Sequence, residues 1–142
     1  MSPSADAPTP SAISEALNLT TGQIVQEIGY DDDVDHDLRD AIEDLIGEEM
    51  EDEDTQEIVD AVVLWWRDDD GDVADGLVDA MTDLTDKGII WLLTPKVGRS
   101  GFIDPSSVAE GVTIAGLSLT RTANVAPDWQ ATKVVRPKNT RR

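Results

Sequence analysis

Short apolar runs alternate along this chain with segments whose apolar residues recur every three or four positions. The apolar runs lie at residues 23–29, 58–66 and 89–93, and Gly, Pro or acidic residues bound each of them. Their length and their content of Val and Ile predict buried strands. Because strands that alternate with helices form parallel sheets with crossover connections, the pattern indicates an α/β fold.

Segments with helical spacing follow these strands. Residues 31–46 carry apolar side chains on one helical face, after three aspartates that suit an N-cap, and Gly47 follows as a helix-terminating residue. The same spacing predicts helices over residues 73–85 and 106–117, the latter with Ser106 as its N-cap.

Two further strands are predicted at residues 119–125 and 132–135. Because only a short link joins them, they fit an antiparallel pair at one edge of a mostly parallel sheet. Residues 48–54 hold six acids in seven positions and predict a loop or a short edge element.

The prediction for domain organisation is a single acidic α/β domain over residues 19–138 between two tails. The N-terminal tail, residues 1–18, begins with a Pro-rich and Ser-rich stretch that predicts disorder and ends with a short helical lead-in. The C-terminal tail, residues 139–142, is basic. Residues 1–14 have neither the basic region nor the apolar run expected of a secretory signal, and the sequence contains no cysteine. The cytoplasm is therefore the expected compartment.

Charge divides the chain into two unequal parts. Residues 1–90 hold 27 acidic and 3 basic side chains, whereas residues 91–142 hold 3 acidic and 8 basic ones, for a total of −19. Long-range repulsion from the acidic part disfavours direct binding to nucleic acid or to an anionic membrane. It favours a basic protein surface as the partner. A homo-oligomer that joins the acidic half of one copy to the basic half of another is a further option.

Two resemblances sharpen the fold prediction. The strings DAVVLWW, GIIWLLTPK, SSVAEGVTIAGL and TKVVRPK follow the order of elements in the C-terminal half of class I methyltransferase-like Rossmann domains. The strings GQIVQEIGYDDDVDHDLRDAIED, WWRDDDGD and WLLTPKVGR resemble a family of small acidic actinobacterial proteins, known as a domain of unknown function. The resemblances imply a reduced Rossmann-like, mostly parallel α/β sheet and no particular activity.

The methyltransferase resemblance places a cofactor turn after the first strand, at Glu27 to Asp31. Methyltransferases of this fold bind S-adenosylmethionine at a glycine-rich turn, because glycine lets the backbone approach the ligand. Here only Gly29 matches, and Tyr30 and three aspartates follow it. The aspartates would repel the carboxylate of the cofactor, so no cofactor is assigned.

Two acidic clusters follow the first and second strands, where open α/β sheets bind ligands. A calcium loop fails on spacing in both clusters, since His36 and Val73 occupy the position that needs glycine. Helix caps with solvated carboxylates explain the clusters without a ligand, and no metal ligand is assigned. As a functional site they predict a partner-binding surface made of Asp31, Asp32, Asp33, Asp35, Asp37, Asp68, Asp69 and Asp70.

The sequence favours a non-enzymatic accessory or regulatory protein that docks a basic partner surface through its acidic half, with no catalytic residue assigned. The alternative is a protein that binds S-adenosylmethionine or a nucleotide, or a divergent methyltransferase. Its cleft would be lined by Glu27, Gly29, Asp33, His36, Thr94 and Lys96. The lone histidine, His36, is otherwise a surface residue in the first turn of a helix.

Overall fold

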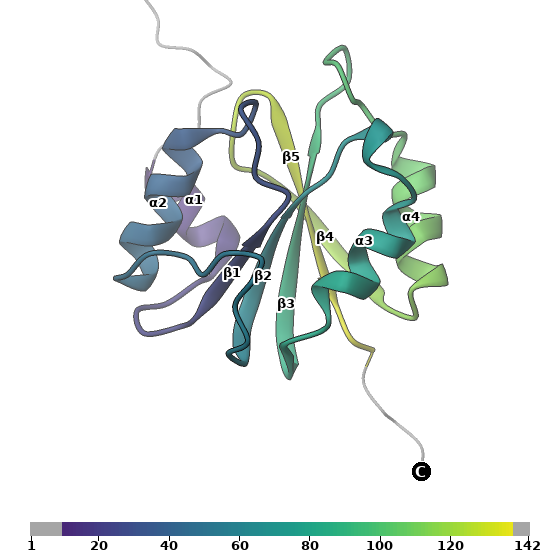
Figure 1. Cartoon of the computed structure of the whole chain (residues 1–142). Helices are drawn as coiled ribbons and strands as arrows, with labels where there is room; N and C mark the ends of the chain where they lie inside the picture. The colour runs from purple at the N-terminus through teal and green to yellow at the C-terminus, as the bar shows by residue number, and fades with distance from the viewer. Residues whose placement is uncertain (1–9, 138–142) are drawn as a thin grey trace, which may run out of the picture.

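A computed structural model describes residues 10–137 and shows a five-stranded open sheet (Figure 1). In spatial order the strands are β1 (Val25–Ile28), β2 (Val59–Trp65), β3 (Leu84–Pro95), β5 (Trp129–Val135) and β4 (Ser118–Asn124). The strands β1, β2 and β3 are parallel, and β5 pairs antiparallel with both β3 and β4. This arrangement confirms the predicted mostly parallel sheet with antiparallel pairing at its C-terminal side.

Four α-helices cover the two faces of the sheet (Figure 1). The helices α1 (Pro10–Leu17) and α2 (His36–Ile46) lie on one face, and α3 (Val73–Ala80) and α4 (Pro105–Ile114) lie on the other. A short 3₁₀ helix, η1 (Asp68–Asp70), links β2 to α3. Because both faces are covered, β2 is buried along nearly its whole length, as its continuous apolar run predicts.

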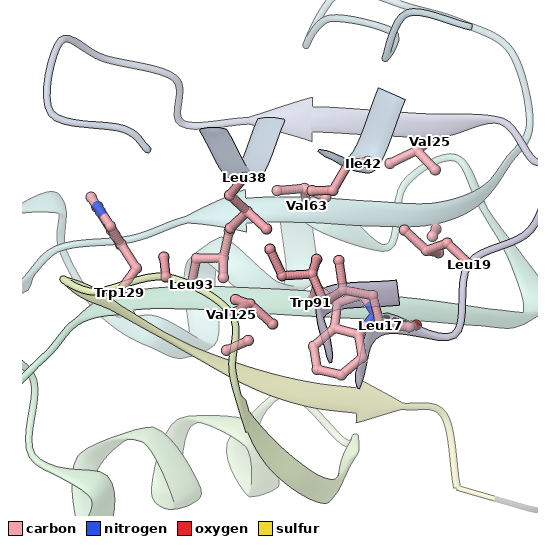
Figure 2. Close-up of a cluster of buried hydrophobic side chains, with 14 of the residues drawn as sticks. Leu17, Leu19, Val25, Leu38, Ile42, Val63, Trp91, Leu93, Val125 and Trp129 are labelled. Atoms are coloured by element: carbon pink, nitrogen blue, oxygen red, sulfur yellow. Dashed lines mark hydrogen bonds between the residues drawn. The ribbon is translucent and has the colours of Figure 1, made fainter. Parts of the chain in front are cut away.

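Alternating side chains of the central strands divide the core into two clusters. Val63, Trp65, Trp91 and Leu93 face α1 and α2, whereas neighbouring residues of the same strands face α3 and α4. Figure 2 shows side chains of the first cluster, in which Leu38 and Ile42 of α2 meet the sheet.

Two helix starts differ from their predictions because different side chains make the caps. The helix α2 begins at His36, and its N-cap is Asp35, whose carboxylate accepts a hydrogen bond of 2.8 Å from the Leu38 amide. The aspartates before it form a loop. The helix α4 begins at Pro105 after Asp104, and Ser106 lies inside its first turn. Proline suits this first position because its missing N–H needs no partner there.

The helix α3 is shorter and β3 is longer than the helical spacing predicts. The helix ends at Ala80, and Leu84 already pairs with Val59 of β2. Pairing between strands that are distant in sequence thus overrides the local helical pattern. The acidic segment 48–54 contributes a single parallel bridge between Glu51 and Gln26, which agrees with the predicted short edge element.

The folded domain begins earlier than the predicted boundary at residue 19. Ile13 and Leu17 of α1 are buried in the first core cluster, and the indole of Trp91 donates a hydrogen bond of 3.2 Å to the Leu17 carbonyl. The predicted lead-in is therefore part of the domain. The predicted disordered stretch up to residue 9 and the basic tail at residues 139–142 lie outside the described residues.

Candidate functional site

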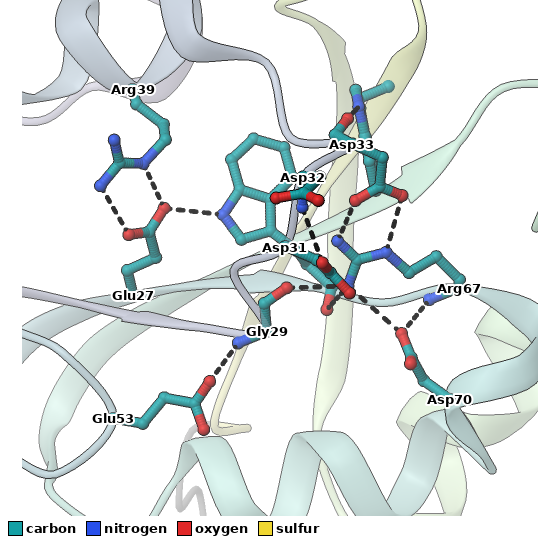
Figure 3. A network of polar contacts seen from close by, with 11 residues as sticks. Glu27, Gly29, Asp31, Asp32, Asp33, Arg39, Glu53, Arg67 and Asp70 are labelled. Carbon is teal, nitrogen blue, oxygen red and sulfur yellow. Dashed lines mark hydrogen bonds and ion pairs between the residues drawn. The ribbon is translucent and has the colours of Figure 1, made fainter.

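Glu27, near the carboxyl end of β1, lies at the centre of one polar contact network. Its carboxylate accepts hydrogen bonds of 2.7 and 2.8 Å from the guanidinium of Arg39 and one of 2.9 Å from the indole of Trp65 (Figure 3). The hydrogen bonds to Glu27 raise the pKa of Arg39 against the opposing effect of burial. Glu27 therefore joins α2 to β2, and its carboxylate is already engaged within the protein.

Gly29 turns the chain sharply against β2. Its φ of +85° is in the left-handed region, and a Cβ atom there would lie 2.2 Å from the Trp65 carbonyl oxygen. Only glycine fits so close an approach. Its amide donates a hydrogen bond of 2.8 Å to the carboxylate of Glu53. The backbone at this turn thus contacts the protein's own strand and acidic segment.

Arg67, which follows β2, connects both acidic clusters to this turn. Its guanidinium donates two hydrogen bonds to Asp33, at 2.5 and 3.0 Å, and one of 2.8 Å to the Gly29 carbonyl (Figure 3). It also contacts the carboxylate of Asp70 at 3.3 Å. Only 8% of Arg67 is exposed. This guanidinium lies between the ends of β1 and β2, where an open crevice would otherwise be expected.

The pKa values of the Arg67–Asp33 pair follow from these contacts. The hydrogen bond from Arg67 is the main cause that lowers the pKa of Asp33, and it outweighs the opposite effect of burial. Burial disfavours the charged form of Arg67, but its contacts with Asp33 and Asp70 raise its pKa overall. Both groups are therefore held in their charged forms.

Trp129, the first residue of β5, packs its indole ring beside the guanidinium of Arg67. Its ring centroid lies 5.2 Å from the guanidinium carbon, and its indole donates a hydrogen bond of 3.2 Å to the Asp33 carbonyl. The ring of Trp65 meets it edge-on, with 4.8 Å between centroids. An aromatic face beside a guanidinium adds cation–π attraction.

Sequence reasoning missed the roles of Arg39 and Arg67. A signal was present, since they are two of only three basic residues among the first 90. A lone basic residue next to a buried strand in so acidic a segment is a candidate for an internal ion pair.

The structure brings the two predicted acidic clusters together at the carboxyl edge of the sheet. Asp31 and Asp33 from the first cluster and Asp69 and Asp70 from the second line one polar cavity of about 500 Å³. Arg67, Arg99 and Asp128 also line it. The rest of the predicted partner-binding set lies outside this cavity, namely Asp32, Asp35, Asp37 and Asp68.

The residues of the predicted small-molecule cleft are divided among different places. Glu27 lines a second cavity, of about 450 Å³, with Tyr30, Arg39 and residues 52–54. Asp33 lines the polar cavity, and Thr94 and Lys96 line a third cavity on the α4 side of the sheet. His36 lies at the exposed start of α2, with its ring centroid 6.1 Å from that of Tyr30.

Residues 10–137 contain no group of three or more His, Cys, Asp or Glu side chains that could hold a metal ion. None of the helices within this range has the length and apolar character needed to cross a membrane.

Comparison with known families identifies the chain. Residues 14–138 match the model of a family described as "Protein of unknown function (DUF3052)". The chain belongs to the DUF3052 family. Its relatives include the uncharacterized proteins Rv2239c of Mycobacterium tuberculosis (strain H37Rv) and Mb2263c of Mycobacterium bovis. Each is 46% identical over 123 residues, which cover 87% of this chain and 77% of the relative.

Solved structures similar to this DUF3052 protein include several methyltransferases and a biosynthetic protein. The pyocyanin biosynthetic protein PhzM gives a TM-score of 0.64 at 12% identity, and the mitomycin 7-O-methyltransferase MmcR gives 0.58 at 13%. The chain covers 54% of each of these two proteins, with 89% and 90% of its own length aligned. The magnesium protoporphyrin IX methyltransferase ChlM of Synechocystis, solved with bound SAM, gives 0.55 at 11% identity. At these identities the likeness shows a methyltransferase-like Rossmann fold.

Proposed function

We propose that this DUF3052 protein is a non-enzymatic docking protein that binds a basic surface of another protein. The observation that carries the proposal is the polar cavity, into which Asp31 and Asp33 converge with Asp69 and Asp70. The two pairs come from different loops, so the fold concentrates carboxylates at one edge. A concentrated negative field attracts a basic partner and speeds its encounter with this edge.

Two of the four converging carboxylates, Asp31 and Asp69, remain available to a partner, and the neighbouring Asp32 does as well. Among the described residues, ion pairs involve only four carboxylates, namely Glu27, Asp33, Asp70 and Asp128. Asp31, Asp32 and Asp69 are exposed and lie outside these pairs. Each would accept hydrogen bonds from a lysine or arginine side chain of the partner.

The space above Gly29 is filled by side chains of the protein itself, which also supports a docking function. Arg67 and Asp33 lie against this turn, and the Gly29 backbone is folded onto Trp65. The close backbone approach that Gly29 permits is therefore an approach to Trp65 of the same protein and not to a ligand. A cofactor that needed the same backbone would have to displace an ion pair held by several hydrogen bonds.

The test is a titration of the ¹⁵N-labelled protein with a peptide of alternating arginine and serine, at low and at physiological salt. The variant Asp31→Asn/Asp32→Asn/Asp69→Asn should weaken peptide binding strongly. The matched control Asp44→Asn/Glu48→Gln/Glu49→Gln changes the net charge equally, but its exposed carboxylates lie at the other end of α2 and beyond. Equal weakening by both variants would show attraction to overall charge and would overturn the proposal.

A second candidate is binding of S-adenosylmethionine or a similar nucleoside, and the cavity beside Glu27 and Tyr30 favours it. This cavity lies at the carboxyl end of β1, and its carboxylates at residues 52–54 suit the hydroxyl groups and the cationic centre of such a molecule. The fit is incomplete, because Glu27 is already engaged by Arg39 and Trp65, and the acidic lining opposes the ligand's carboxylate.

Calorimetry with S-adenosylmethionine and S-adenosylhomocysteine separates the two candidates. Micromolar binding, with amide shifts confined to Tyr30 and residues 52–54, would replace the docking function by the second candidate. Absence of heat at millimolar ligand, together with peptide binding at Asp31 and Asp69, is the result that the docking proposal expects.

A further inference from the structure

A third cavity, of about 430 Å³, differs in chemistry from the rest of this acidic protein. It lies between α4, the loop of residues 96–104 and the strands β3, β5 and β4. Its walls are mainly apolar and include Phe102, Val108 and Leu119. Although the chain has a net charge of −19, none of the described residues that line this cavity is acidic, and the only charged one is Lys96.

The sheet side of this cavity carries the hydroxyl groups of two threonines. Thr94 follows Leu92 by two positions in β3, and Thr132 precedes Val134 by two in β5, so both threonines face the α3 and α4 side. The residues are 4% and 3% exposed, and within residues 10–137 neither hydroxyl forms a side-chain hydrogen bond. Neither hydroxyl oxygen is among the fully buried polar atoms that lack a partner, so both are accessible from the cavity. An accessible hydroxyl without a protein partner can donate a hydrogen bond to a ligand group or accept one from it.

Among the described residues that line this cavity, Lys96 supplies the one charged group. The Lys96 ammonium donates a hydrogen bond of 2.7 Å to the Asn124 side chain, which leaves other N–H donors for a ligand. An apolar cavity of this size with a few convergent polar groups is typical of a small-molecule site. One lysine without a neighbouring carboxylate among the lining residues selects for a negative ligand group.

We propose that this cavity binds a small, mainly apolar molecule with one anionic group, such as a carboxylate. The apolar part would pack against Val108 and Phe102, and the anionic group would accept hydrogen bonds from Lys96 and the two threonines. The site is separate from the docking edge, because Pro95 is the one described residue that lines both this cavity and the polar cavity. Binding of such a molecule therefore does not depend on the proposed docking function.

The test uses three probes that share one hydrocarbon chain, namely octanoate, octanol and octylammonium. Binding is followed by amide shifts in ¹⁵N spectra at Thr94, Val108 and Thr132. Octanoate should bind about fivefold more tightly than octanol, a factor that corresponds to about 1 kcal/mol for one partly exposed ion pair. Octylammonium should bind most weakly at these amides. Lys96→Gln should remove the preference for octanoate, whereas Lys87→Gln, which changes an exposed lysine outside the cavity, should keep it.

A second variant tests the place of binding. Thr122 is exposed on β4 and lines the cavity, so Thr122→Trp should block it and abolish the shifts for every probe. Thr120→Trp is the matched control, since Thr120 is exposed on the same strand outside the cavity. Octylammonium shifts at these amides as large as those of octanoate, or octanoate binding that survives Thr122→Trp, would overturn the proposal. Absence of shifts with millimolar octanoate would overturn it as well.

Discussion

Replacing Gly29 by alanine should destabilise the protein far more than the same change at Gly98. The two glycines have nearly the same φ, +85° and +86°. A left-handed conformation costs an alanine about 1–2 kcal/mol at either place. At Gly29 the new Cβ would also lie 2.2 Å from the Trp65 carbonyl oxygen, whereas at Gly98 no atom lies within 4 Å.

The difference between the two variants isolates the contact with β2. Overpacking of a well-packed interior costs about 1–3 kcal/mol, so Gly29→Ala should lose about 2–5 kcal/mol in total. That loss is a large share of the stability of a domain of this size. Urea unfolding followed by tryptophan fluorescence measures both free energies of unfolding. Equal losses for the two variants would refute the inference that the Gly29 turn is held against Trp65.

Three further predictions concern charge. Arg67→Met should lower the free energy of unfolding by about 2–4 kcal/mol, because the carbonyls of Gly29 and Trp65 lose a buried donor. The control Arg99→Met breaks an exposed ion pair and should change the free energy of unfolding by less than about 1 kcal/mol. Similar losses for the two variants in urea titrations would contradict the structural role of Arg67. Because the folded pKa of Asp33 is lowered, its ionisation stabilises the fold above about pH 4, and this contribution is lost as the pH falls through that pKa. Acid titrations of Asp33→Asn should therefore show a shallower loss of stability than the unchanged protein, and parallel curves would exclude this linkage. Raising NaCl from about 0.02 M to about 0.5 M should increase the midpoint of urea unfolding, because salt screens the repulsion among the carboxylates. A falling midpoint would mean that the ion pairs outweigh this repulsion.

Apolar runs and helical spacing predict those elements whose buried positions can be recognised from neighbouring residues in the sequence. The continuous apolar run at residues 58–66 predicted β2, and the helical spacing before Gly47 predicted the end of α2. The start of β3 was not predictable in this way, since Leu84 is placed by pairing with Val59 and not by its sequence neighbours. The order of the last two strands was equally hidden, because an alternating pattern does not say which neighbour a strand pairs with.

The candidate site was predictable to a similar extent. The rule that carboxyl ends of parallel strands meet at one edge placed Asp31 and Asp69 near each other, and the structure brings both to one cavity. The same rule put Thr94 and Lys96 at that edge, but their side chains line the cavity on the α4 side of the sheet. The direction of a side chain depends on pleat and register, which the order of elements does not specify.

The position of β5 has a consequence for the synthesis of this protein on the ribosome. Its residues, Trp129–Val135, are made last among the strands, yet they lie between β3 and β4. Until they leave the ribosomal tunnel, β4 has no neighbour in the sheet and one edge of β3 stays unpaired. The sheet therefore cannot close before β5 has emerged from the tunnel, and completion of the domain waits for its last strand.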